Sequence, residues 1–450
     1  MTIRSPAVAG IFYPAAPDAL DQVVRACLDG SRAEPGAAKA IVAPHAGYVY
    51  SGPIAGTSFR SVAHLADEIT RVVLIGPSHR MAFPGLAAPS ATGLSTPLGT
   101  IAVDTAALQR ALACPQVRVF DQPFEGEHAL EVELPFIQVL FPRASVVPLI
   151  VGDAGAEAVD KVLEELWGGP ETLIVISSDL SHFHGYEAAQ ALDLGTSQAI
   201  EVAAPGKIDG NGACGHRALA GLLRRAAKLD LRVTTRDLRN SGDTSGARDR
   251  VVGYGSYTFE YAQQAGLSEP QRKQLLEAAY ATLRNIGQKG RAPDVALPSF
   301  PLPLRAMRKT FVTLEIDGHV RGCVGSLAPV HPLIADVVGN TYKAARQDRR
   351  FTPMTPEELG RAKVTISILS HLRPVPFSNE EELVDELRPE IDGLVLCEGD
   401  RRALLLPKVW DSLPQAQDFL AILKKKAGLP PAPLSRNAQA FRFTAETFAG

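Results

Sequence analysis

Three apolar runs near the start of the chain each end in a histidine: AIVAPH (40–45), RVVLIGPSH (71–79) and LIVISSDLSH (173–182). The runs are continuous rather than alternating and are rich in β-branched residues, which is typical of strands buried on both faces of a parallel sheet. The carboxyl ends of such strands meet at one edge of the sheet. We therefore expect residues that are distant in the chain to meet there in one pocket.

The segments between these runs indicate an α/β fold. Residues 146–151 predict a further strand, and residues 53–68 and 157–167 predict helices that cross between strands. Ser51 is the expected cap of the first helix, and His64, which falls inside it, is expected to be structural. The amino-terminal part of the chain should be a mainly parallel sheet flanked by helices.

The length of the chain predicts two domains, because 450 residues exceed what one hydrophobic core usually supports. We expect the boundary near residues 262–268, where a strand-like segment ends and a helix opens with Ser268 as its cap and Pro270 in its first turn. The predicted domains are residues 1–262 and a smaller α/β (α+β) domain over residues 268–450.

Composition excludes several classes of protein. The formal net charge of -3 and the lack of a long basic tract give no sign of a nucleic-acid partner. No run approaches the ~20 apolar residues that cross a bilayer, so no membrane association is expected. The five cysteines are scattered and never spaced as CxxC, which suits a reducing compartment. These features predict a cytoplasmic protein.

Histidines at strand ends suggest a metal site. Neutral imidazole suits Fe(II), Zn(II) or Cu(II), and a catalytic site needs about three protein ligands and an open position. His45 and His79 supply two ligands, and Cys214, just before a predicted helix, is the candidate third. A helix amino terminus should stabilise its thiolate. The alternatives are histidines that only form hydrogen bonds in turns and a cysteine that is a small buried hydrophobe.

Other residues near these strand ends are candidates for proton transfer. His182 suits a general acid or base outside the metal's ligands, and Asp179 could orient it or the substrate. His128 follows Glu125 and Glu127 closely and could act as a proton relay or substrate contact. His184 is a further candidate.

A series of motifs over residues 7–220 closely resembles the Memo family. The matching runs are VAGIFYPA (8–15), APHAGYVYSGPIAG (43–56), GPSHR (76–80), STPLGTIAVD (95–104), EHALEVELPF (127–136), SSDLSHF (177–183) and ACGHRAL (213–219).

The Memo resemblance implies a fold like that of the class III extradiol dioxygenases, which are non-haem Fe(II) enzymes. It implies that His45, His79 and Cys214 are the metal ligands and that Asp179 and His182 line the same pocket. The dioxygenases bind iron through two histidines and a carboxylate, so a thiolate at Cys214 would make this site softer. We expect one transition-metal ion, first Fe(II), with copper or zinc as alternatives, and a small-molecule substrate.

The second half of the chain resembles the AMMECR family in the runs FVTLEIDGHVRGCVGSLAP (311–329), RQDRRFTPMTPEEL (346–359) and LLLPKVW (404–410). Fusion of these two families resembles the AmmeMemoRadiSam systems, whose third member is a radical S-adenosylmethionine protein. This chain has no CxxxCxxC motif, so that partner would be a separate polypeptide.

Few residues of the second half point to a chemistry. Gly322 and Gly325 could let a ligand approach the backbone, or could simply belong to a strand pair that buries Cys323. A nucleophilic Cys323 with His331 as its base, and an anion site at Arg349, are weaker hypotheses, the second because a solvated helix face explains the charges there.

Two functions of different classes follow from the sequence. The first is a metal-dependent redox enzyme related to the class III extradiol dioxygenases. The second is a non-catalytic protein that binds a metal, an anion or a phosphopeptide, since some animal Memo proteins are associated with phosphotyrosine recognition. A third hypothesis makes the AMMECR-type domain the enzyme and the Memo-type domain its supplier of metal or cofactor.

Overall fold

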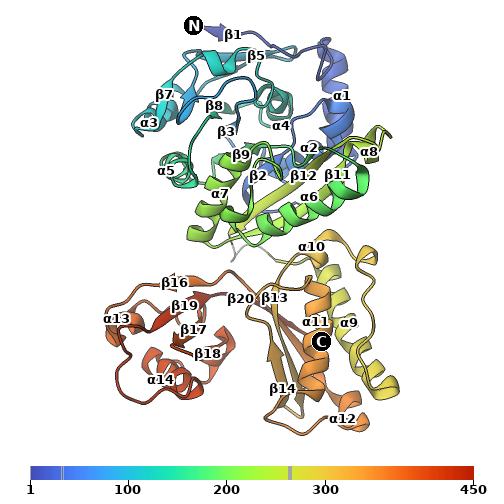
Figure 1. Cartoon of the computed structure of the whole chain (residues 1–450), viewed down its shortest axis with the longest axis vertical. Helices are drawn as coiled ribbons and strands as arrows, with labels where there is room; N and C mark the ends of the chain where they lie inside the picture. The colour runs from blue at the N-terminus through green and yellow to red at the C-terminus, as the bar shows by residue number, and fades with distance from the viewer. Residues whose placement is uncertain (1, 32, 34, 262–265) are drawn as a thin grey trace. The chain divides into compact units, whose positions relative to one another are not determined.

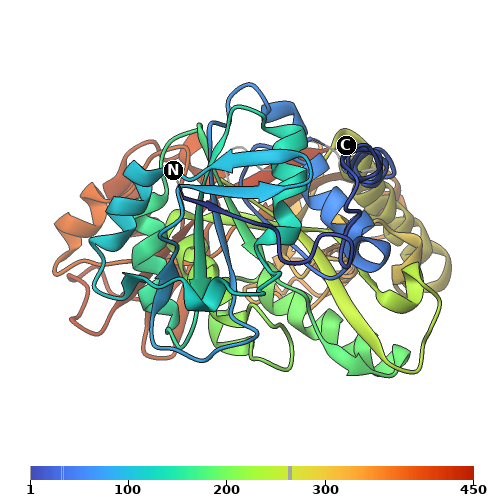
Figure 2. The ribbon, with the colours of Figure 1, turned by 90° about the horizontal axis from the view of Figure 1, so that it is seen from above.

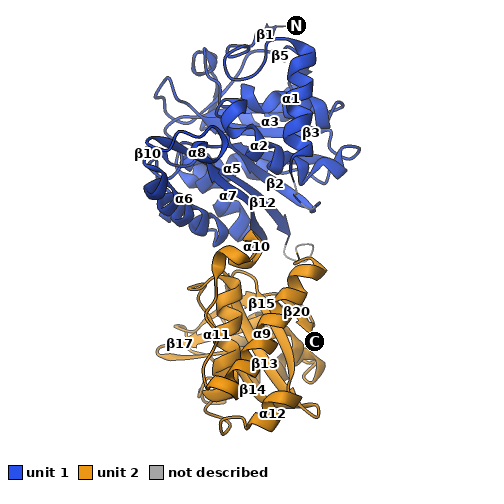
Figure 3. Cartoon of the chain, turned by 90° about the vertical axis from the view of Figure 1, so that its right-hand side faces the viewer, with its two compact units in different colours: residues 1–265 blue, residues 266–450 orange. Residues whose placement is uncertain are grey.

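The computed structural model describes residues 2–31, 33, 35–261 and 266–450, and it divides the chain into two compact units, residues 1–265 and 266–450 (Figure 3). The first part of the predicted boundary, residues 262–265, lies outside the described residues. Each unit is described below by itself.

A nine-stranded mixed sheet forms the core of unit 1 (Figure 1, Figure 2). Its four central strands run in the order β2-β9-β3-β8 and are all parallel, as the apolar runs predicted. Strands β12 and β4 flank them in the antiparallel direction. The central strands are β2 (Ala38–Ala43), β9 (Thr172–Ser177), β3 (Arg71–Pro77) and β8 (Ser145–Val151); the others are β10 (His182–His184), β11 (Leu231–Asn240), β12 (Val251–Tyr261), β4 (Leu86–Ala88) and β7 (Val117–Val119).

Helices pack beside this sheet in two groups, α1 with α2 and α4, and α3 with α5 and α7. Their apolar faces join the central strands in one continuous hydrophobic core. A small separate sheet, β1-β5-β6, carries the start of the chain. The helices of this unit are α1 (Pro17–Asp29), α2 (Tyr48–Arg60), α3 (Thr105–Leu112), α4 (Leu134–Leu140), α5 (Ala156–Leu166), α6 (Tyr186–Glu201), α7 (His216–Leu229) and α8 (Ser241–Thr244), and the small sheet has β1 (Ile3–Arg4), β5 (Gly93–Thr96) and β6 (Gly99–Ala102).

The prediction for α2 is wrong at both ends. The helix begins at Tyr48 and ends at Arg60, so Pro53 lies inside it rather than in its first turn. Ser51 is therefore no cap, and its hydroxyl donates to the carbonyl of Ala46 at 2.8 Å. Proline marks a helix start only statistically. The glycines of α2 let it pack closely on α1, because a side chain at Gly56 would overlap the carbonyl of Cys27.

Unit 2 has the α+β architecture that was expected. It opens with α9 (Glu269–Lys289), capped by Ser268 as predicted. Two four-stranded antiparallel sheets follow, in the orders β14-β13-β15-β20 and β16-β19-β17-β18. The strands are β13 (Lys309–Ile316), β14 (His319–Gly325), β15 (Lys363–Leu369), β16 (Arg373–Val375), β17 (Gly393–Glu398), β18 (Arg401–Leu405), β19 (Gln439–Phe443) and β20 (Ala445–Ala449), and the helices after α9 are α10 (Leu302–Arg305), α11 (Leu333–Arg346), α12 (Pro356–Arg361), α13 (Glu380–Asp385) and α14 (Ala416–Lys426).

The glycines of β14 serve packing rather than a ligand. A side chain at Gly322 would overlap the carbonyl of Ala344 in α11, and one at Gly325 would overlap the ring of Phe311. The thiol of Cys323 accepts a hydrogen bond from the Thr313 hydroxyl at 3.2 Å on the neighbouring strand. The strand pair is therefore present, with Cys323 half-buried rather than buried, and packing against Ala344 and Phe311 gives the two glycines a structural reason.

We predict that each unit folds alone, because each has its own hydrophobic core among the described residues. Residues 1–265 and 266–450 expressed separately should each unfold in one cooperative thermal transition. Calorimetry of the two fragments and of the full chain tests this. A fragment that shows no transition by itself, while the full chain shows one, would mean that the units depend on each other.

Candidate metal centre

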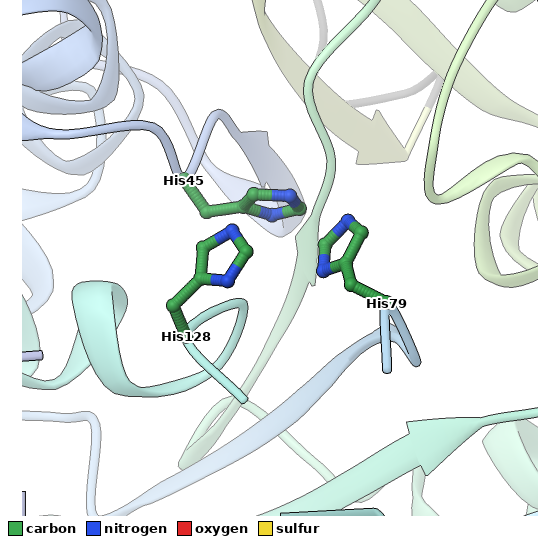
Figure 4. A group of neighbouring side chains, drawn as sticks. All are labelled: His45, His79 and His128. Carbon is green, nitrogen blue, oxygen red and sulfur yellow. The ribbon is translucent and has the colours of Figure 1, made fainter. Parts of the chain in front are cut away.

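Three histidines meet at the carboxyl edge of the central sheet (Figure 4). His45 follows β2, His79 follows β3, and His128 comes from the loop before α4. One ring nitrogen of each lies within 4.8 Å of the others, and the rings of His79 and His128 stack with their centres 4.6 Å apart. His45 and His79 therefore lie together, as expected from the strand ends. His128, expected as a proton relay or substrate contact, joins them as a candidate ligand.

Glu127 holds the ring of His79 through Nδ1, which lies 2.8 Å from Glu127 Oε1, and His128 Nδ1 lies 3.3 Å from the same oxygen. An ionised carboxylate only accepts hydrogen bonds, so the ring of His79 carries its proton on Nδ1. This assignment leaves Nε2 of His79 available as a ligand atom, which is the usual arrangement at metal sites.

Glu127 is the buried anion that organises this loop. Only 3% of its surface is exposed, and it also accepts hydrogen bonds from the backbone amides of His79, His128 and Ala129 at 2.7–3.0 Å. Burial opposes ionisation of this carboxyl, but the hydrogen bonds outweigh it and hold its pKa at about 2. Glu127 is therefore charged at any physiological pH.

The hydrogen bonds around Ser177 show which ring nitrogen of His45 carries the proton. The Ser177 hydroxyl lies 2.6 Å from the Ala129 carbonyl, 2.7 Å from His45 Nδ1 and 3.0 Å from Glu133 Oε1. Its single proton goes to the carbonyl, which can only accept. His45 Nδ1 and Glu133 must then both donate to the serine oxygen. Glu133 is completely buried, and burial raises its pKa well above the usual value, so it carries the proton that this count requires.

Burial favours the neutral form of His45 and His128. It lowers the pKa of His45 far below its ordinary value and that of His128 to about 4, and the neighbouring rings lower both further. Burial also lowers the pKa of His182, whose Nδ1 donates to the Leu180 carbonyl at 2.9 Å. The charge of His182 contributes to lowering the pKa of both His45 and His128.

Cys214 lies beside His45, with its Sγ 3.3 Å from His45 Nε2. Two donors on one tetrahedral zinc ion, at Zn–S and Zn–N lengths of about 2.3 and 2.0 Å, would be about 3.5 Å apart, so this thiol is placed to be a further ligand. The expectation of a thiolate stabilised by α7 is wrong for the metal-free protein. Burial and the Asp179 carboxyl raise the pKa of the Cys214 thiol above its usual value.

Asp179 supports the backbone that carries His45. Its carboxyl accepts a hydrogen bond from the His45 amide at 2.8 Å, and only 4% of the residue is exposed. Burial raises its pKa to about 7, against the effect of this hydrogen bond. The loop after it is also fixed, since the Ser181 amide donates to Asp193 at 3.0 Å. Asp179 is thus placed to orient a ligand.

Sequence reasoning missed the groups that hold the rings. Ser177 and Glu133 were not singled out, and Glu127 was considered only as a neighbour of His128. A signal was present, because Glu127, Glu131 and Glu133 stand in an otherwise apolar stretch, where acids are unusual unless they are paired.

The fold and this site define an α/β protein with a candidate three-histidine metal centre. A family model described as Memo-like protein matches residues 4–258, more than half of the chain, so the chain belongs to the Memo-like family. A second model, described as AMMECR1, matches residues 276–448. Both family resemblances drawn from the sequence are confirmed.

Relatives match the chain along nearly their whole length. A MEMO1 family protein of Thermotoga petrophila is 33% identical over 284 residues, which are 56% of this chain and 97% of that protein. One of Methanosarcina acetivorans is 33% identical over 282 residues, 58% and 100% of the two chains. The crystal structure of an uncharacterized protein from Pyrococcus horikoshii is 27% identical and covers 41% of this chain and 93% of that one, with a TM-score of 0.38, which adds nothing to the assignment.

We predict that Glu133 orients His45 by donating a hydrogen bond to Ser177. Glu133→Gln keeps a donor at this position and should bind Zn(II) as the wild type does. Glu133→Leu removes the donor and should weaken binding by about 10- to 100-fold, as for other groups that support a metal ligand. Metal titration against a chelator measures both variants, and equal affinity in the two would refute the role.

Asp179 should make the metal-free protein less stable as the pH rises. Its pKa is raised in the folded state, so the folded protein holds this proton more tightly than the unfolded chain does. Its contribution is fully present below about pH 4, the value of an unperturbed aspartate, and is lost as the pH rises through about 7. Asp179→Asn should flatten the fall in urea-unfolding free energy across this window. A slope equal to that of the wild type would contradict the assignment.

Proposed function

We propose that unit 1 is a metal-dependent redox enzyme related to the class III extradiol dioxygenases. The observation that carries the proposal is a set of three imidazoles whose ring nitrogens, one from each, lie within 4.8 Å of one another. Nδ1 of His45 and Nδ1 of His79 are held by Ser177 and Glu127. Burying His45 completely costs solvation, and imidazoles gathered in this way are a common arrangement for binding an ion.

The residues present fit one transition-metal ion. Neutral imidazoles suit Fe(II), Cu(II) and Zn(II), and the Cys214 thiol is a soft fourth donor next to His45. Four donors would fill a tetrahedral zinc site but leave two positions open on six-coordinate Fe(II). Fe(II) is therefore our first choice for a catalytic ion, and when bound it would supply one-electron and O₂ chemistry.

The remaining residues act on the substrate and its protons. His182 is neutral near pH 7 because burial lowers its pKa, and its Nε2 is free because Nδ1 donates to Leu180. It can take a proton from a bound substrate and return it later. Asp179 titrates near pH 7 and holds the His45 backbone, so it keeps the ligand in place while remaining able to share a proton.

The fusion to an AMMECR1 domain supports a role in a shared pathway, and we propose a separate radical S-adenosylmethionine protein as a partner. A non-catalytic binding protein is the competing function. Purified full-length chain, loaded anaerobically with Fe(II), should consume O₂ in the presence of a small organic substrate and not in its absence. Metal uptake without turnover over a broad screen of substrates would favour the binding function.

Replacing a ligand should remove the metal. His45→Ala and His79→Ala should each lower metal affinity by much more than the 10- to 100-fold expected for a supporting group. His128→Ala and Cys214→Ala show which of these two residues is a ligand as well. Replacing a true ligand should lower the metal affinity as much as His45→Ala or His79→Ala does. Elemental analysis at limiting metal gives the result, with His64→Ala as a matched control on a short helix of the same unit. Full metal content in both the His45 and His79 variants would refute the site.

His182 should be needed for turnover and not for metal binding. A proton-transfer residue contributes roughly 10²- to 10⁴-fold to the rate, so His182→Ala should keep its ion and lose activity by such a factor. Metal content and turnover are measured on the same preparation. A variant that loses its ion as completely as His79→Ala would place His182 among the ligands.

A further inference from the structure

Arg80 places a cation against the loop that leads to His128. It follows His79 in the chain, and its guanidinium packs on Gly126: a side-chain carbon at residue 126 would lie 3.1 Å from Arg80 Cζ and Nε. Gly126 has a φ of +66°, a backbone conformation that favours glycine, and any larger residue there would press on Arg80. The guanidinium thus lies against the loop that carries His128, and its charge helps to lower the pKa of that ring.

No acid neutralises Arg80 in the part of the chain that the structure describes. The residue is exposed, and neither an ion pair nor a hydrogen bond ties it to another described residue. The acid that follows Gly126 is Glu127, whose carboxyl is already occupied by the ring of His79 and by backbone amides. The planar set of donors on Arg80 therefore remains available to a ligand.

Arg80 by itself favours an anionic ligand. An exposed cation with no acid partner among the described residues attracts an anion, and a neutral ligand gains nothing from it.

Aromatic side chains lie next to the same histidines. The ring of Phe12 lies 4.6 Å from that of His128, tilted by 39°. Phe183 follows His182, is 61% exposed and has a φ of +61°, a strained conformation for a phenylalanine. Backbone strain of this kind is found at ligand sites more than elsewhere. The ring of Phe12 offers a flat apolar surface beside His128, whereas the guanidinium of Arg250 lies over the ring of Phe183, 5.1 Å from its centre.

We infer that the substrate is a small organic anion, with a carboxylate that pairs with Arg80 and a flat apolar body that lies against Phe12. A guanidinium matches the two oxygens of a carboxylate through parallel hydrogen bonds. Phosphopeptide sites instead gather several arginines. This inference deepens the proposed function and rests on it for the position of the reacting group.

Calorimetric titration of the Zn(II)-loaded full chain with three probes tests the inference. Benzoate has both the charge and the flat body, benzamide lacks the charge, and acetate lacks the body. Benzoate should bind at least tenfold more tightly than either. Arg80→Gln should weaken benzoate by about 10- to 100-fold, the effect of a charged hydrogen bond, and leave benzamide unchanged, whereas Arg80→Lys should retain part of the affinity. Arg60→Gln, at the far end of α2, is the matched control and should bind benzoate as the wild type does.

Several results would overturn the inference. They are equal benzoate affinity in the wild type and Arg80→Gln, equal affinity for benzoate and benzamide, and binding of a phosphotyrosine peptide far tighter than that of benzoate. The same titrations on metal-free protein separate this inference from the proposed function. If the chain takes up no metal but binds benzoate through Arg80, the anion site is supported and the metal enzyme is refuted. If the chain takes up metal but binds benzoate equally well without Arg80, the metal site is supported and the anion site is refuted.

Discussion

The buried carboxylate of Glu127 is the interaction on which the centre depends. It connects the end of β3 to the loop before α4, because it binds the ring and amide of His79 and the backbone at His128 and Ala129 at the same time. An ionised carboxylate is expensive to bury unless nearly all of its acceptor positions are used. Glu127 therefore fixes the positions of His79 and of the loop at His128, because its carboxylate has few other hydrogen-bonding arrangements available.

The second support of the site has the opposite protonation. Glu133 is buried without a cationic partner and stays protonated, so it can donate to Ser177 and through it set the orientation of His45. Glu127 and Glu133 lie in the same short stretch of sequence. Glu127 is ionised and can only accept hydrogen bonds, whereas Glu133 is protonated and donates one. Their environments, rather than their identity, decide which role each takes.

The sheet and the family could be predicted from the sequence, while the details of the site could not. Continuous apolar runs identify parallel strands, and strand ends explain why His45 and His79 meet. The role of His128 was not predicted, because it comes from a loop whose path depends on the buried Glu127. The thiolate at Cys214 was expected from its place before a helix, but desolvation exceeds that local effect. The start of α2 was missed because a proline usually marks a helix start, whereas Pro53 lies inside this helix.

The loops that carry the histidines have a consequence for how the protein is made. His45, His79 and His128 are dozens of residues apart in the chain, and they meet only when three different connections of the sheet are in place. A nascent or partly unfolded chain cannot offer this set of donors to an ion, so the metal cannot guide the early stages of folding. An ion that this cluster takes up could only bind the finished domain, and it would then stabilise that domain by an amount that rises with the logarithm of the free metal concentration. The supply of metal would thus bear on how long the protein stays folded.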